Sequence, residues 1–297
     1  MATPELARKL IRGNWKALLE RAENIEVLTL DEKLVSDETC AGWQEERKYL
    51  DASYVKRTLT RDAYAIDAER KVVFLYLKNI ISPQLQADAL KGVLAMRMYF
   101  AKNSQRSALQ DAGARARELQ FGWRDRGRNR TELYVPTKKQ VPAFMATWPL
   151  LRRMDGLFRF WLRTHWLIQQ FKIKWWRVPH TCFSTVTFLK SAPTAVHVDG
   201  GNAKAGLSCL TTLGNYTGGD LLFPQSGVLI PVQPGDLLIG AFHQNYHCNL
   251  KPVDGERYSV IGYFREKLPT EDESLAAMVP ENLKSRWQWW HGVTRPR

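Results

Sequence analysis

The clearest hydrophobic pattern lies in the C-terminal third of the chain, where short apolar runs are separated by Gly, Pro and Asn. Gly218-Gly219 and Pro234-Gly235 supply turn signals between the runs. Eight short strands divided by turns are typical of a jelly roll, in which antiparallel sheets face each other. The predicted strands are Phe183–Leu189, Ala195–Val198, Leu207–Leu213, Asp220–Phe223, Gly227–Val232, Asp236–Ile239, His243–Asn249 and Arg257–Phe264.

The pattern ahead of residue 181 is mainly helical. One apolar run, Val72 to Leu77, is short and β-rich enough for a buried strand. Ser82 and Pro83 then predict a helix start, and helical character continues over residues 83–118. The arginine- and glycine-rich stretch 121–130 predicts an exposed loop, and residues 146–176 predict one or two helices packed on a sheet. Residues 1–70 read as helical and irregular.

Composition narrows the class of protein. The 297 residues are 44% hydrophobic and 25% charged, as in an ordinary globular chain. No apolar run approaches the ~18 residues of a membrane span, and the N-terminus lacks the apolar stretch of a signal peptide. Four scattered cysteines without a CxxC pair fit reduced thiols. We therefore expect neither a secreted nor a membrane-spanning protein.

The positive charge is concentrated in one segment. Residues 91–177 hold 19 Lys and Arg against five Asp and Glu, whereas the rest of the chain is nearly balanced, and the total is +13. A field of this kind attracts nucleic acid or an anionic membrane surface. The alternative is that the basic residues form a solvated helix face. An interfacial membrane helix within 146–176 is disfavoured because its dense aromatic residues suit packing on a sheet.

Candidate metal chemistry begins at His197-Val198-Asp199. On a strand, side chains at i and i+2 leave from the same face, so this imidazole and carboxylate would point into a barrel together. A distant histidine would complete a 2-His-1-carboxylate triad of the Fe(II) type, and His247 is the favoured candidate over His243. Arg257, with Ser259 beside it, suits the binding of a dicarboxylic acid. Satisfied core histidines and a surface ion pair remain the alternatives.

Residues 181–266 resemble the double-stranded β-helix core of Fe(II)- and 2-oxoglutarate-dependent dioxygenases. More narrowly, they resemble the TET and J-binding-protein branch, which oxidises methylated bases in nucleic acid, and its compact microbial and fungal members. One departure is Ser191, where this branch would have asparagine six residues before the first metal histidine. The phrases that carry the likeness are T-A-V-H-V-D (194–199), G-N-Y-T-G-G-D-L-L-F-P (214–224) and P-G-D-L-L (234–238).

The resemblance implies a set of cofactors and site residues. Fe(II) would be bound by His197, Asp199 and His247. The cosubstrate 2-oxoglutarate would chelate the metal and place its far carboxylate on Arg257 and Ser259, O2 would be the oxidant, and no catalytic residue is implied beyond the metal ligands. An enzyme acting on a stacked base must flip it out. Phosphate contacts are therefore expected from Arg124, Arg126, Arg128, Arg130, Lys138 and Lys139, and base contacts from Asn202, Tyr263 and Arg265.

The expected organisation is an α+β fold with a double-stranded β-helix core, jelly-roll or cupin-like, flanked by helices. Residues 1–70 would form an N-terminal helical or irregular extension. Residues 71–268 would form the dioxygenase domain, with a basic helical and loop part at 81–180 and the β core at 181–268. Residues 269–297 would be a helical tail.

The leading functional hypothesis is a DNA dioxygenase that oxidises the methyl group of 5-methylcytosine, with further oxidation of the product. Demethylation of N6-methyladenine by the same iron chemistry is the enzymatic alternative. A non-catalytic nucleic-acid-binding module, or a protein or small-molecule hydroxylase, are alternatives of other classes. The expected partner is double-stranded DNA with methylated bases and not a membrane. We expect a monomer in the nucleus, or in the nucleoid or cytosol of a cell without one.

Overall fold

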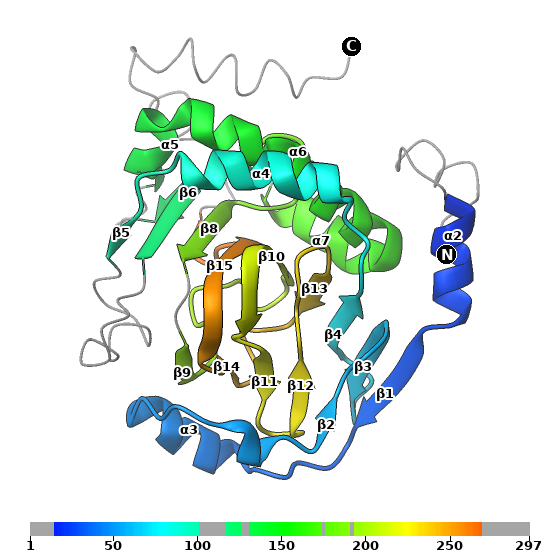
Figure 1. Cartoon of the computed structure of the whole chain (residues 1–297). Helices are drawn as coiled ribbons and strands as arrows, with labels where there is room; N and C mark the ends of the chain where they lie inside the picture. The colour runs from blue at the N-terminus through cyan, green and yellow to red at the C-terminus, as the bar shows by residue number, and fades with distance from the viewer. Residues whose placement is uncertain (1–14, 101–116, 126–130, 174–175, 191–192, 269–297) are drawn as a thin grey trace.

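Two facing β-sheets form the centre of the molecule in the computed structural model, which describes residues 15–100, 117–125, 131–173, 176–190 and 193–268 (Figure 1). The larger sheet has the order β1 (Glu26–Leu30), β3 (Ala63–Asp67), β4 (Val72–Leu77), β13 (Leu237–Gly240), β10 (Ser208–Gly218), β15 (Pro252–Tyr263), β8 (Thr185–Lys190), β6 (Arg117–Asp125) and β5 (Tyr99–Phe100), with β7 (Thr131–Leu133) paired to β6. The smaller sheet has the order β2 (Arg57–Thr58), β12 (Val228–Ile230), β11 (Leu221–Phe223), β14 (His247–Asn249) and β9 (Thr194–His197).

The expected fold class is confirmed. All eight strands predicted after residue 181 are present as β8 to β15, and they form the double-stranded β-helix core of a mixed α+β protein. The bounds differ most at the third and the eighth, because β10 continues to Gly218 and β15 begins already at Pro252. At the seventh, residues 241–246 form a turn and β14 begins only at His247. The core therefore places β9 and β14 side by side in the smaller sheet.

Helices cover the outer face of the larger sheet (Figure 1). They are α4 (Pro83–Leu94), α5 (Val135–Lys139), α6 (Val141–Trp161) and α7 (Arg163–Ile173). All six residues of β4 are buried because both of its faces are covered. Phe74 and Tyr76 belong to the cluster between the sheets, whereas Leu75 and Leu77 pack with the helices. The predicted start of α4 is correct, since the Ser82 hydroxyl accepts a hydrogen bond from the Leu85 amide at 3.4 Å.

The turn before β13 explains the P-G-D phrase. The buried Asp236 carboxylate accepts hydrogen bonds from the Tyr76 hydroxyl at 2.7 Å and from the Asn79 and Gln233 amides at 2.9 and 3.0 Å. Gly235 has φ +100°, a left-handed conformation that glycine adopts without strain. The turn thus fastens β13 to β4, its neighbour in the larger sheet.

The stretch from 83 to 130 differs from the prediction. The helix ends at Leu94 instead of continuing to 118, and Arg117–Asp125 forms strand β6 where a helix end and a loop were expected. Leu119, Phe121 and Trp123 are buried at every second position, which is the period of a strand. The arginines around them concealed that alternation. Residues 101–116 lie outside the described part of the chain.

Residues 1–70 also differ from the helical and irregular prediction. They contain α2 (Trp15–Glu23), α3 (Asp37–Glu45) and a short 3-10 turn (Ala52–Tyr54), but also three strands. Strands β1 and β3 extend the larger sheet, and β2 pairs with β12 in the smaller one. Alanines at 63 and 65 are fully buried in β3, and their small side chains gave little hydrophobic signal. The predicted tail helix at 271–297 lies outside the described residues.

The remaining expectations concern membranes and cysteines. None of the described helices is both long enough and apolar enough to cross a bilayer. The longest, α6, carries Arg152, Arg153, Asp155 and Arg159. All four cysteines are buried as free thiols.

Candidate metal centre

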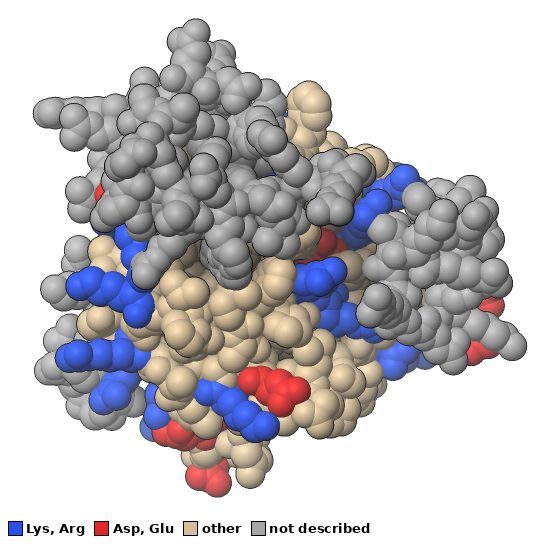
Figure 2. All heavy atoms as spheres, turned by 90° about the horizontal axis from the view of Figure 1, so that it is seen from above, with Lys and Arg blue, Asp and Glu red and all other residues tan. Residues whose placement is uncertain are grey.

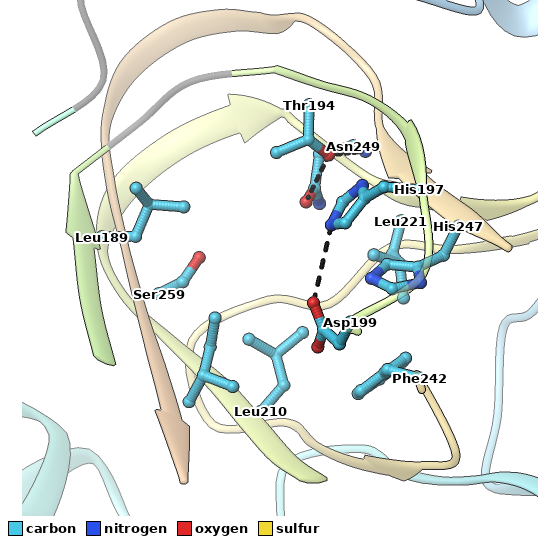
Figure 3. A pocket seen from close by; sticks show the side chains of 11 residues that line it. Leu189, Thr194, His197, Asp199, Leu210, Leu221, Phe242, His247, Asn249 and Ser259 are labelled. Carbon is cyan, nitrogen blue, oxygen red and sulfur yellow. Dashed lines mark hydrogen bonds and ion pairs between the residues drawn. The ribbon is translucent and has the colours of Figure 1, made fainter. Parts of the chain in front are cut away.

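The structure brings together the three residues predicted to bind metal. His197 at the end of β9 lies opposite His247 of β14 in the strand register, and the ring centroids are 4.4 Å apart. The Asp199 Oδ1 lies 3.7 Å from His197 Nε2. One ligand atom from each residue lies within 4.8 Å of the others (Figure 3). Because β9 ends at His197, Asp199 enters the site from the following loop and not from the strand itself.

The hydrogen bonds of both histidines fix which nitrogen can bind a metal. His197 Nδ1 lies 2.8 Å from the Ala195 carbonyl oxygen, and His247 Nδ1 lies 3.0 Å from that of Asn245. A carbonyl only accepts, so each Nδ1 carries the proton and each Nε2 would be the nitrogen that binds a metal. Two neutral imidazoles and one carboxylate fit Fe(II) and leave coordination positions for other ligands. His243 is not a member of this cluster.

Asn202 holds the third ligand in place. Its Nδ2 donates to Asp199 Oδ2 at 3.1 Å and lies 2.9 Å from the Ser208 hydroxyl. Because a carboxylate only accepts, the nitrogen of this amide must face Asp199. The backbone amide of Asp199 also donates to the Phe242 carbonyl at 2.9 Å. Asn202 is the residue predicted to read a base edge, and its side-chain nitrogen is therefore already engaged with the protein.

A pocket between the two sheets is lined by His197, Asp199 and His247. In Figure 3, His197 and Asp199 point toward one another, and Leu189 and Ser259 lie on the far wall. The lining combines apolar side chains with a few polar groups, a combination typical of small-molecule sites. The lining residues are Leu189, Thr194, His197, Asp199, Leu210, Leu221, Phe242, His247, Asn249, Ser259 and Ile261.

Arg257 lies beside the pocket on strand β15 and contacts one of the lining residues, Ser259. Its side chain is buried, with 2% of the residue exposed, and Nη1 donates to the Ser259 hydroxyl at 2.8 Å. Burial lowers the pKa of Arg257, and the neighbouring Tyr216 and Asp220 oppose that shift. The guanidinium carbon lies 5.8 Å from the centre of the Tyr216 ring. The arrangement suits the binding of a carboxylate that enters the pocket.

Gly219 makes room for this arginine. A Cβ at position 219 would lie 3.1 Å from Arg257 Cδ, closer than an ordinary van der Waals contact, and the residue has φ +72°. Only glycine adopts this conformation without cost while leaving that space. The second glycine of the G-G phrase is thus explained by its contact with Arg257.

Tyr263, the last residue of β15, and Arg265, just beyond its end, follow Ser259 and Ile261 at every second position. The Tyr263 hydroxyl lies 3.5 Å from the Thr187 hydroxyl and accepts from Arg265 Nη1 at 3.3 Å. Tyr263 is buried, whereas Arg265 is half-buried. The backbones of Asn202 and Arg265 form an isolated β-bridge. The three residues predicted to contact a base therefore lie at the end of the pocket wall opposite Arg257.

Tyr134 was not predicted, although it connects this end of the pocket to the basic segment. Its ring centre lies 6.0 Å from the Arg265 guanidinium carbon and 5.3 Å from that of Arg124. Burial raises the pKa of Tyr134. Arg124, on β6, also donates through Nε to Glu132 at 2.6 Å. Of the predicted arginine loop, Arg126, Arg128 and Arg130 lie outside the described residues.

Several other arginines of the basic segment have structural contacts. Arg153 donates to the Ile80 carbonyl at 3.2 Å, and Arg159 lies 4.6 Å above the Trp166 ring. Burial lowers the pKa of both guanidinium groups. Lys138 and Lys139 end α5. Figure 2, which views the molecule from the helical side, shows Lys and Arg mainly along the edges of this face, with other residues between them.

Comparisons with known proteins place this site in a family. Residues 138–266 match the Tet_JBP model, described as the oxygenase domain of the 2OGFeDO superfamily. Thymine dioxygenase JBP1 of Crithidia fasciculata is 30% identical over 139 residues, which are 44% of this chain and 17% of that protein. The bifunctional helicase and thymine dioxygenase JBP2 of Trypanosoma cruzi is 28% identical over 144 residues, 47% of this chain and 13% of that protein. The chain thus spans less than a fifth of these relatives.

A solved structure of NgTET1 in complex with 5mC DNA has the same fold. The TM-score is 0.60 at 13% identity, over 89% of this chain and 98% of that one. Fold and His-Asp-His site together define an oxygenase of the Fe(II)- and 2-oxoglutarate-dependent superfamily. Within that superfamily, residues 138–266 are similar to the TET/JBP branch. The resemblance seen in the sequence and the expected cofactors Fe(II), 2-oxoglutarate and O2 are thereby confirmed.

Proposed function

We propose that this protein is a DNA base dioxygenase that hydroxylates the methyl group of 5-methylcytosine and oxidises the product further. The observation that carries the proposal is the His197–Asp199–His247 cluster, in which both Nδ1 atoms are engaged with carbonyl oxygens, inside a TET/JBP oxygenase domain. The activity of the whole chain is part of the proposal because its relatives are much longer proteins.

Each group of residues would have one task. His197, Asp199 and His247 would hold Fe(II), which with 2-oxoglutarate and O2 supplies the oxidation of an unactivated C–H bond. Arg257 and Ser259 would bind the far carboxylate of 2-oxoglutarate, since they lie together at the pocket wall. The apolar lining beside them, including Leu189 and Leu210, would exclude water from the reacting atoms.

DNA would approach the other end of the pocket. The target base is stacked in a duplex and must be flipped into the site. Arg265 is half-buried there and contacts Tyr134, which in turn contacts Arg124. We propose that Arg265, with Tyr263 and Asn202 behind it, faces the flipped base. Arg124, Lys138 and Lys139, with Arg126, Arg128 and Arg130, would contact phosphates.

Thymine is the second candidate substrate, because the two relatives described above are named as thymine dioxygenases. Thymine and 5-methylcytosine carry the methyl group at the same ring position. They differ at the Watson–Crick edge, where cytosine has an amino donor and thymine a carbonyl acceptor. The choice between them therefore depends on the groups that face the base edge and not on the iron chemistry.

Product analysis by mass spectrometry tests the proposal. Duplexes containing 5-methylcytosine, thymine or N6-methyladenine are each incubated with purified protein, Fe(II) and 2-oxoglutarate. We expect oxygen to be added to 5-methylcytosine, and oxidation of thymine alone would transfer the assignment to the second candidate. Formaldehyde release from N6-methyladenine would indicate demethylation. No product from any duplex, with intact metal binding, would favour a protein or small-molecule hydroxylase.

A matched pair of variants separates catalysis from binding. His197→Ala should abolish product formation and leave DNA affinity unchanged. His165→Ala, on α7 outside the His197–Asp199–His247 cluster, should leave both product formation and DNA affinity unchanged. Unchanged product formation in His197→Ala would contradict the metal assignment. DNA affinity should fall steeply with salt, because phosphate contacts release counterions.

We propose that the protein acts as a monomer and where DNA is found, in the nucleus or the nucleoid.

A further inference from the structure

Strand β9, which carries the first metal ligand, is the last strand of the smaller sheet within the described part of the chain. It pairs with β14 along one side only. Backbone amides alternate in direction along a strand, so those of Val196 and Val198 point away from β14. An edge strand with amides left without acceptors would be poorly fixed.

The N-terminal segment supplies both acceptors. The Val196 amide donates to the Lys48 carbonyl at 2.9 Å, as a neighbouring strand would arrange. The Val198 amide donates to the side-chain Oε1 of Gln44, also at 2.9 Å. Gln44 thus takes the place of a backbone carbonyl at the position where no strand continues.

Helix α3 holds Gln44 in this position. Cys40 lies one turn earlier on the same helix face, is fully buried and packs in one cluster with Val196 and Cys248. Residues four apart on a helix lie on the same face. Gln44 therefore extends from a helix already packed against β9 and β14.

The hydrogen bond from Val198 to Gln44 lies between two of the proposed metal ligands. Val198 lies between the ligands His197 and Asp199, so the Gln44 bond orients the peptide unit that joins the strand to the loop. The Asp199 amide is fixed next, by the Phe242 carbonyl at 2.9 Å. We propose that Gln44 is a positioning residue that holds the His197 and Asp199 side chains in metal-binding geometry.

The inference rests on the proposed metal site, and its test measures metal binding instead of turnover. The probe is Co(II) alone, a redox-stable substitute for Fe(II), titrated into the full chain and followed by calorimetry and by the visible absorption of Co(II). Gln44→Leu removes the acceptor at nearly constant volume, Gln44→Glu keeps an oxygen at that place, and Gln44→Asn shortens the side chain. Glu45→Leu, at the exposed neighbouring position, is the control for changes to α3 and its charge.

We expect Gln44→Leu to bind Co(II) about tenfold more weakly than the wild type, which is typical of a lost outer-sphere partner. Gln44→Glu should restore most of the affinity, and Glu45→Leu should bind like the wild type. Hydrogen exchange of the Val198 amide should be faster in Gln44→Leu than in Gln44→Glu. If Gln44→Leu does not fold, Gln44→Asn should show the same loss.

The outcomes separate this inference from the proposed function. If the wild type binds Co(II) through His197, and Gln44→Leu binds it equally well, the positioning role is wrong and the metal site stands. Equal losses in Gln44→Leu and Gln44→Glu would also overturn the role, because the acceptor oxygen would then not matter. If the wild type does not bind Co(II), or if His197→Ala binds it unchanged, the proposed metal site itself is wrong.

Discussion

Asn202 links Asp199, one of the three proposed metal ligands, to strand β10 of the larger sheet. Its Nδ2 lies between Asp199 Oδ2, at 3.1 Å, and the Ser208 hydroxyl on β10, at 2.9 Å. Asp199 follows the end of β9 in the smaller sheet, whereas β10 lies in the larger one. One side chain therefore sets the position of the carboxylate relative to both walls of the pocket.

This contact predicts the effect of Asn202→Ala. The Asp199 carboxylate would lose its donor and sample other rotamers, so affinity for Co(II) should fall about tenfold. Calorimetric titration measures it, and Asn215→Ala at an exposed position on β10 is the matched control. Equal affinities of Asn202→Ala and the wild type would show that the contact does not orient the ligand.

Arg257 should control the affinity for 2-oxoglutarate. In Arg257→Lys the planar fork that matches a carboxylate is replaced by a point charge. Arg257→Lys should lose a hydrogen bond to the charged carboxylate. Because such a bond contributes about 1.5–3 kcal/mol, the KM for 2-oxoglutarate should rise about tenfold or more. Succinate release at varied 2-oxoglutarate measures the KM, with Arg152→Lys on the exposed face of α6 as the control. An unchanged KM would place the carboxylate elsewhere.

Two glycine substitutions should have opposite effects. Gly219→Ala introduces a left-handed alanine and a Cβ 3.1 Å from Arg257 Cδ, so the free energy of unfolding should fall by about 1–2 kcal/mol. The displaced Arg257 should also raise the KM for 2-oxoglutarate. Gly42→Ala, in α3 with no atom within 4 Å of the added Cβ, should instead gain about 0.5–1 kcal/mol. Denaturant unfolding measures the free energy of unfolding of both variants. An unchanged value for Gly219→Ala would contradict the crowding at Arg257.

Asp155 should make stability depend on pH. It is buried under α7, and Oδ1 accepts hydrogen bonds from Trp166 Nε1 at 2.9 Å and from the Cys182 amide at 2.7 Å. Burial raises the pKa of this carboxyl above its ordinary value of 3.8. The folded state therefore binds the proton more tightly than the unfolded chain, and this contribution to stability is lost as pH rises.

Asp155→Asn keeps an acceptor oxygen for both donors and removes the buried charge. Its free energy of unfolding should match the wild type at pH values below the ordinary carboxyl pKa and exceed it by about 1 kcal/mol at neutral pH. Thermal unfolding across this range measures the difference. Asp88→Asn, at a side chain of α4 that is 49% exposed, should show the opposite trend, because the pKa of Asp88 is lowered. A difference independent of pH would mean that Asp155 does not titrate in this range.

The β core was predictable because its signals are local. Each of the eight strands after residue 181 is a short apolar run bounded by turn residues, and the P-G-D phrase marks a turn whose carboxylate binds its own neighbours. His197 and Asp199 are two residues apart, so any extended backbone directs them to one side. Strand β6 carried the same period in Leu119, Phe121 and Trp123, yet its arginines favoured a loop.

The amino-acid sequence by itself thus determined the strand-rich core, the metal-binding residue types and the location of the basic segment. Tertiary structure alone decided that residues 1–70 complete both sheets and that Gln44 meets Val198, 154 positions away. It also decided that Asn202 directs its nitrogen to Asp199, and that Tyr134 contacts Arg265. The physical reason is that strand formation follows from the local alternation of side chains. A hydrogen bond between distant segments instead depends on chain paths that no local pattern records.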